Sequence, residues 1–327
     1  MEYSLQAICN EFIENRRILK NVFKAQPDAV YPMCANLYCA HNKPADEQKL
    51  LRCKQLVKED SKKHKRFHGN MYALVSCILA LSDNPEEKLR QSEEHYHLLK
   101  QYFTPCDQLV FAAFTLADLA EPGKAREIIE RGHQLYQYVH QTHRALISED
   151  DGVLAVLMAF SEKTNDELIE DVESCYRTLK TMAQGKYVRN AALILGLSDR
   201  ESKEKSEAFI ELFNVLKAHG LNITKNYMLS VLASISILGI DPEMIAAEIE
   251  DVDKFLSMQK GYKGLFGTDK KRRLLHSALI VTTANSPGIM PDVVSVKSLL
   301  PLLAVQVIMM ISCTMSTLSL NQPKEDK

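Results

Sequence analysis

Residues 153–179 read VLAVLMAFSEKTNDELIEDVESCYRTL, and this stretch joins two segments of different character. The first segment, Val153–Phe160, is apolar throughout, which is typical of a helix that is buried on all sides. In the second segment, from Leu168 to Leu179, apolar side chains fall at positions i, i+1, i+4, i+7, i+8 and i+11. That spacing follows one face of a helix, so the stretch predicts a buried helix followed by an amphipathic one.

The same two-segment unit recurs along the chain with a period of about 39 residues. The ends of the apolar segments are spaced 38, 41, 37 and 41 residues apart, at Leu81, Leu119, Phe160, Leu197 and Leu238. Large side chains anchor the amphipathic segments at spacings of 40, 40, 37 and 42 residues: Tyr96, Tyr136, Tyr176, Phe213 and Phe255. We therefore expect an all-α fold of stacked antiparallel helix pairs, similar to an α-solenoid.

This register divides the chain into three regions. We expect an N-terminal helical unit over residues 1–66, five helix-pair repeats over residues 67–268, and C-terminal helices over residues 269–327 that pack on the last repeat. The regions are predicted to form one continuous structural unit. The chain has only 12 Gly and 11 Pro among 327 residues, so it has few signals for tight turns, which favours helices over β-hairpins.

Composition places the protein among ordinary globular proteins, with 46% hydrophobic and 25% charged residues. The net charge of −2 gives no global attraction to nucleic acid, and no nucleic-acid-binding motif accompanies the basic segment Lys49–His68. The first twenty residues alternate charged and apolar side chains and show no apolar core of a signal peptide. We therefore expect the eight cysteines to be reduced and the protein to be cytoplasmic.

The segment Ser298–Leu320 is 23 residues long and has no charge. That length is sufficient to cross a bilayer, so a C-terminal tail anchor is one interpretation. The segment also contains Pro301, Gln306 and several Ser and Thr residues, which are unfavourable in hydrocarbon. A buried helix that closes the last repeat is the interpretation we favour.

Candidate metal ligands and catalytic groups are sparse. His64 and His68 have the i, i+4 spacing of zinc proteases, but Lys65 stands where those enzymes need a glutamate. Cys34 and Cys39 are five positions apart, which places them on different faces of a helix. Five histidines lie on two neighbouring amphipathic segments: His95, His97, His133, His140 and His143. None has the spacing of a nucleophile–base pair, so we predict no catalytic residue, metal or cofactor.

The most unusual stretch is a loop rich in glycine and basic residues, from Lys260 to Arg273. Glycines free backbone amides, and a helix start at Thr268 or Asp269 offers more of them, so the loop predicts a site for an anionic ligand or a partner segment. The candidate residues are Lys260, Lys263, Gly264, Gly267, Lys270, Lys271 and Arg272. The alternative is a long loop capped by Thr268 or Asp269 with a solvated basic first turn.

Three motifs resemble a known family. Tyr31-Pro32-Met33-Cys34-Ala35, then Phe67-His68-Gly69-Asn70, and finally the loop Gly261–Gly267 are similar to the bacterial family catalogued as domain of unknown function 4003. The resemblance implies a one-piece helical protein and brings no catalytic residue. We expect a non-enzymatic binding or scaffold protein with a protein partner or anionic ligand; the alternatives are an enzyme with a helical active site and a tail-anchored membrane protein.

Overall fold

The computed structural model describes residues 1–24, 26–64, 67, 69–142, 151–182, 186–221, 228–264, 267–286, 300–301 and 303–311. These residues form helices joined by turns and loops, and no strand occurs among them. The all-α fold class is therefore confirmed.

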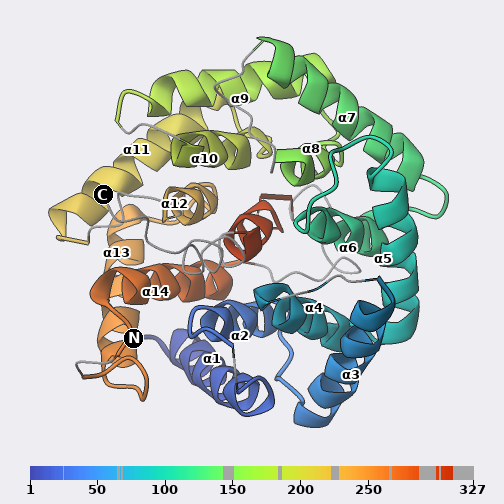
Figure 1. Ribbon diagram of the computed structural model, residues 1–327. Coiled ribbons are helices and arrows are strands. Elements are labelled where there is room, and N and C mark those ends of the chain that lie inside the picture. Colours follow the sequence, from blue (N-terminus) through green and yellow to red (C-terminus); the bar gives the residue numbers. More distant parts are fainter. Residues whose placement is uncertain are drawn as a thin grey trace, which may run out of the picture.

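Fourteen labelled helices alternate between an outer and an inner layer of the described chain (Figure 1). The outer helices are α1 (Tyr3–Val22), α3 (Glu47–His64), α5 (Pro85–Leu99), α7 (Ala125–Thr142), α9 (Asn165–Leu179), α11 (Ser202–Ala218) and α13 (Pro242–Ser257). The inner helices are α2 (Val30–Ala40), α4 (Asn70–Leu81), α6 (Leu109–Leu119), α8 (Gly152–Met158), α10 (Lys186–Gly196), α12 (Met228–Ser236) and α14 (Lys270–Ala284).

The helix pairs close into a ring rather than an open solenoid (Figure 1). The last inner helix, α14, packs against both α1 and α2, so the two ends of the stack meet. The outer helices have 15 to 20 residues and the inner ones 7 to 15. Each helix pair is therefore longer in the outer layer than in the inner layer, so it has the shape of a wedge. A stack of such wedges curves, and its two ends approach each other. The solenoid-like arrangement is not confirmed, and the extended concave surface expected of it is absent from the described part of the ring.

The two kinds of helix have the environments that their patterns predict. Every residue of the apolar helices α8 and α12 is buried. The amphipathic helix α9 buries Leu168, Ile169, Val172, Cys175 and Leu179 of its predicted stripe, and the sixth member, Tyr176, is half-buried. It begins with a capping box in which Thr164 accepts from the amide of Glu167, and the Glu167 carboxylate accepts from the amide of Thr164.

A further helix over residues 300–311, described except at residue 302, lies in the middle of the ring (Figure 1). We call it the central helix. Its side chains at Leu300, Ala304, Val305, Val307 and Ile308 are each at most 3% exposed. Because it covers the inner helices, those helices are apolar on the side that faces the ring centre as well as on the side that faces the outer layer.

The predicted buried helix at Ser298–Leu320 is therefore confirmed for the described residues 300–311, which lie inside the ring. Residues 312–320 lie outside the described residues. Within the described part of the chain, no helix has the length and apolar character needed to cross a bilayer. The tail-anchor alternative has no support here.

The periodic landmarks fall at equivalent places. Leu81 and Leu119 end α4 and α6, and Phe160, Leu197 and Leu238 follow α8, α10 and α12 by one or two residues. Leu81 and Leu197 are buried, whereas the other three are half-buried at the helix ends. The anchors Tyr96, Tyr136, Tyr176, Phe213 and Phe255 lie on the outer helices α5, α7, α9, α11 and α13. The closely packed pairs have a different register from the predicted unit. They join an outer helix to the inner helix that follows it, as in α5 with α6 and α9 with α10, whereas the predicted unit joined an apolar helix to the amphipathic helix after it. The same pairing is present in residues 1–66, where α1 packs with α2, and α3 packs with α4 across the predicted boundary at residue 66.

Candidate functional site

A cavity of about 260 Å³ lies where the inner helices α2, α4 and α6 end, against the central helix. We call it the ring cavity. Its polar lining consists of His41, Lys43, Ser82, Asp83, Lys88, Thr115, Asp118 and Gln306. Its apolar lining consists of Leu37, Ile78, Leu81, Phe111, Phe114, Leu119, Leu303, Val307 and Met310. The volume is close to the lower end of the range for small-molecule sites.

Two ion pairs form the charged part of the wall. The Lys88 ammonium lies 2.6 and 2.9 Å from the two carboxylate oxygens of Asp118, and these side chains are 13% and 43% exposed. The Lys43 ammonium donates to the Leu81 carbonyl oxygen at 3.1 Å and lies 3.6 Å from the Asp83 carboxylate. The Asp83 side chain is 97% exposed, so the cavity is open to solvent on that side.

His41 is half-buried at the C-terminal end of α2. Its Nδ1 lies 2.8 Å from the Leu37 carbonyl oxygen. A carbonyl can only accept, so Nδ1 carries the proton, and Nε2 keeps a lone pair in the neutral ring. Burial lowers the pKa of His41, and the positive charges of Lys88 and Lys43 act in the same direction. Nε2 makes no hydrogen bond to any other described residue and is available as an acceptor.

The opposite wall is largely apolar and includes the central helix. Phe111 and Phe114 of α6 face Leu303 and Met310 across the cavity lining. Gln306 of the central helix adds an amide that makes no hydrogen bond to another described residue. The arrangement suits a small ligand with an apolar body and one polar end, because most of the binding area is apolar and the polar groups are few and local.

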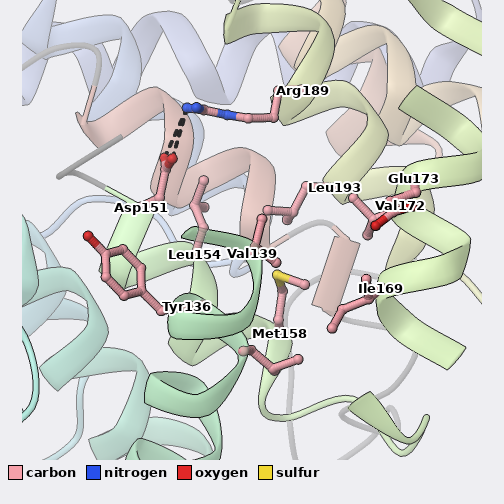
Figure 2. A pocket seen from close by; sticks show the side chains of 12 residues that line it. Tyr136, Val139, Asp151, Leu154, Met158, Ile169, Val172, Glu173, Arg189 and Leu193 are labelled. Atoms are coloured by element: carbon pink, nitrogen blue, oxygen red, sulfur yellow. Dashed lines mark hydrogen bonds and ion pairs between the residues drawn. The ribbon is translucent and has the colours of Figure 1, made fainter. Parts of the chain in front are cut away.

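A second, much smaller space of about 30 Å³ lies between the pairs α7–α8 and α9–α10 (Figure 2). Apolar side chains such as Leu154, Met158 and Leu193 line it, and the Asp151–Arg189 ion pair lies at one end (Figure 2). The carboxylate and guanidinium are 2.9 Å apart and both side chains are less than 10% exposed. One or two water molecules would fill this space, so we interpret the pair as a structural link between α8 and α10.

The predicted glycine and basic loop joins α13 to α14 at the point where the ring closes. Arg16 of α1 donates to the Lys260 carbonyl oxygen at 3.0 Å, and its guanidinium lies 4.9 Å from the ring centre of the buried Tyr262. Gly261 has a φ of +89°, and a Cβ there would lie 2.6 Å from the Arg16 guanidinium. Glycine is therefore required at this contact for both reasons.

The candidate residues of this loop are all described and lie together on its surface. Lys260, Lys263, Gly264, Lys270, Lys271 and Arg272 are exposed, and Gly267 is half-buried. Asp269 caps α14, since its carboxylate accepts from the amides of Lys271 and Arg272. These amides are already bonded, so an anion would have to bind the lysine and arginine side chains. Nothing in the described structure tests anion binding, which stays a prediction.

The described residues contain no group of three or more His, Cys, Asp or Glu side chains that fits a metal ion. Cys34, Cys39 and Cys53 are buried free thiols. Burial raises the pKa of Cys53 to about 11, so its thiol stays protonated at neutral pH. The side chains of His64 and His68 lie outside the described residues, as does His143. His95 and His133 lie on α5 and α7.

By fold and site, this is an all-α protein in which a ring of antiparallel helix pairs surrounds a central helix and a polar-walled cavity. The chain belongs to the DUF4003 family: the family model described as "Protein of unknown function (DUF4003)" matches residues 17–306. The resemblance seen in the three sequence motifs is thus confirmed. No curated protein and no solved structure matches the chain.

Sequence reasoning missed the ring cavity, although a signal was present. His41, Asp83 and Asp118 each stand at or next to the C-terminal end of an apolar segment. Polar residues at equivalent positions of neighbouring pairs come together when the inner helices lie side by side. The sequence does not reveal which helix pairs pack against the central helix.

Proposed function

We propose that the protein binds a small amphipathic molecule in the ring cavity and acts as a non-enzymatic binding protein of the bacterial cytoplasm. The observation that carries the proposal is the 260 Å³ cavity, which is lined both by charged residues and by apolar side chains such as Phe114, Leu303 and Met310. Small-molecule sites combine this kind of apolar lining with a few local polar groups.

Because the ring is closed, we place the expected binding site in the interior of the protein rather than on a concave surface. An open stack of helix pairs offers a concave groove for a protein partner. In the closed ring the inner helices face the central helix, so that groove is filled. The ring cavity, at about 260 Å³, has enough volume for a small ligand, whereas the space beside Asp151 has about 30 Å³.

To test the proposal, the protein is purified under native conditions, and its mass is measured by native and by denaturing mass spectrometry. We expect a retained small molecule in the wild-type protein. Leu303→Trp fills the cavity with an indole ring and is expected to abolish retention, whereas Tyr138→Trp on the exposed face of α7 is a control that keeps it. Retention unchanged in the Leu303→Trp variant, with the fold intact, would contradict the proposal.

The same experiment separates binding from catalysis. If the retained molecule is released in a chemically altered form on incubation, and if the alteration needs His41, the enzyme alternative is favoured. The observation that keeps this alternative open is the Nε2 lone pair of His41 in the cavity, since a neutral imidazole is a competent general base.

A second candidate is anion or partner binding at the glycine and basic loop. The observation that favours it is that Lys260, Lys263, Lys270 and Lys271 are exposed and form no ion pair with another described residue. We expect tripolyphosphate to raise the melting temperature in low salt, and the combined change of Lys263, Lys271 and Arg272 to Ala to remove the effect. An equal effect in both proteins would show that the loop is only a connection.

A further inference from the structure

The end of the ring that holds the cavity has a negative backbone field. The inner helices α2, α4 and α6 all end at the cavity, with His41, Ser82 and Ala120 as their C-caps. Each helix C-terminus carries roughly half a negative charge on its last carbonyl groups. Three such ends meet at one small, partly buried space, and together they favour a positively charged ligand group.

The charged side chains of the cavity do not cancel this field. Lys43 and Lys88 face Asp83 and Asp118, so two positive and two negative charges are balanced. The Lys43 ammonium satisfies one helix carbonyl, that of Leu81. The described groups that can still accept a hydrogen bond include His41 Nε2 and the partly exposed Asp118 carboxylate.

We propose that the ligand of the ring cavity is a small organic amine, bound as its ammonium ion, that donates to His41 Nε2 and lays its apolar body against Phe114, Leu303 and Met310. This inference rests on the proposed binding function and names the chemical class of its ligand. The ammonium supplies the donor that His41 Nε2 lacks and the positive charge that the three helix ends favour. A carboxylate in the same place would face the carbonyl ends and a lone pair.

The test compares three ligands with the same phenyl ring: benzylamine, benzyl alcohol and benzoate. Isothermal titration calorimetry at pH 7.5 with the full chain is expected to give the affinity order benzylamine, benzyl alcohol, benzoate. A hydrogen bond from a charged donor is stronger than one from a neutral hydroxyl, so the amine should bind roughly tenfold more tightly than the alcohol.

Two conservative variants of His41 isolate the acceptor. His41→Gln places an amide oxygen near the position of Nε2 and is expected to keep amine binding within a few-fold. His41→Asn keeps a donor for the Leu37 carbonyl but removes the acceptor from the cavity, and should weaken benzylamine roughly tenfold or more while leaving benzyl alcohol little changed. Asp118→Asn, which leaves His41 in place, should weaken benzylamine selectively as well. Melting temperatures of the ligand-free variants establish that each one folds.

The outcomes distinguish this inference from the proposed function. Benzoate as the tightest ligand, with binding abolished by Leu303→Trp, would overturn the amine assignment and retain the cavity as a binding site. Equal losses for amine and alcohol in His41→Asn would also overturn it, because they indicate a change of cavity shape. If none of the three ligands binds and the native protein retains no molecule, both proposals fail.

Discussion

At the scale of single residues, two sets of buried charges in the described chain are paired across helices. Asp151 and Arg189 join the start of α8 to α10, with side chains 9% and 8% exposed. Asp171 of α9 accepts from the ammonium groups of Lys163 and Lys205, and Lys205 is fully buried. Burial of a charged group without a partner costs free energy, because the group loses its hydration. The contribution of these groups to stability therefore depends on the presence of the partner.

The Asp151–Arg189 pair gives a direct test of this dependence. Arg189→Met removes the guanidinium that pairs with the buried Asp151 carboxylate, so we expect a loss of up to about 3–5 kcal/mol in the free energy of unfolding. The double variant Asp151→Leu with Arg189→Met should lose less than the single variant. Urea denaturation measures both, and Arg90→Met at the exposed Arg90–Glu94 pair should cost less than about 1 kcal/mol. A double variant less stable than the single one would contradict this account.

His276 predicts how stability depends on pH. It is buried at the ring closure, where its Nδ1 lies 2.9 Å from the Tyr262 hydroxyl, and burial lowers its pKa to about 3. The unfolded chain binds a proton at this residue near pH 6.5 and the folded chain does not. Its contribution to stability is thus complete above about pH 6.5 and decreases as the pH falls toward 3.

We therefore expect His276→Gln to reduce the loss of unfolding free energy between pH 7 and pH 5 by roughly 2 kcal/mol relative to the wild-type protein. The measurement is urea denaturation at both pH values. The change in unfolding free energy between pH 7 and pH 5 is compared between the variant and the wild-type protein. All other residues are the same in the two proteins, so their contributions to the pH dependence cancel in the comparison. An unchanged pH dependence would show that His276 is protonated in the fold.

At the scale of the elements, basic side chains bind carbonyl groups at the C-terminal ends of three inner helices, α4, α8 and α10. Lys43 donates to the carbonyl of Leu81, the residue that ends α4. Arg131 of α7 donates to the carbonyls of Ala159 and Ser161 beyond α8, at 3.1 and 2.5 Å. Lys163 donates to Gly196 at the end of α10, at 2.8 Å. These bonds satisfy carbonyls that a helix end leaves without an intrahelical partner.

The helix register makes Leu197 and Leu238 a matched pair. Both follow an inner helix, but Leu197 is 2% exposed and Leu238 is half-buried. Leu197→Ala should destabilise the protein by about 2–5 kcal/mol through lost transfer energy and a cavity, and Leu238→Ala by clearly less. Thermal and urea unfolding of both variants provide the comparison. Equal costs would contradict the prediction that the difference in burial between the two positions sets the cost of truncation.

At the scale of the whole molecule, stability depends on filling the centre of the ring. Ile308 of the central helix is 2% exposed. Ile308→Asp places an unpaired charge there, and we expect loss of soluble protein or binding of a hydrophobic dye. Removal of Ser298–Leu320 should have the same effect, because it exposes the apolar inner helices. Tyr138→Asp, at an exposed residue of α7, is the control. A soluble, dye-free Ile308→Asp variant would show that the central helix is dispensable.

The sequence by itself determined the class of the fold and the character of each helix. Periodicity is local information, so it separated fully apolar segments such as Val153–Phe160 from one-faced segments such as Leu168–Leu179. It also predicted that Ser298–Leu320 contains a buried helix, and three short motifs identified the family. The caps at Thr164 and Asp241 are local in the same sense, because each involves residues within three positions of the cap.

Only the tertiary structure decided that the stack closes and where the cavity lies. Closure of the ring depends on a small packing angle that is repeated at every helix pair. That angle depends on how the side chains of neighbouring helices interlock, and the hydrophobic periodicity of the sequence does not specify it. His41, Asp83 and Asp118 are more than thirty residues apart in the sequence and meet only because three inner helices end beside the central helix. The loop from Lys260 to Arg273 stood out by composition, yet its contact with Arg16 was visible only once the first and last pairs were adjacent.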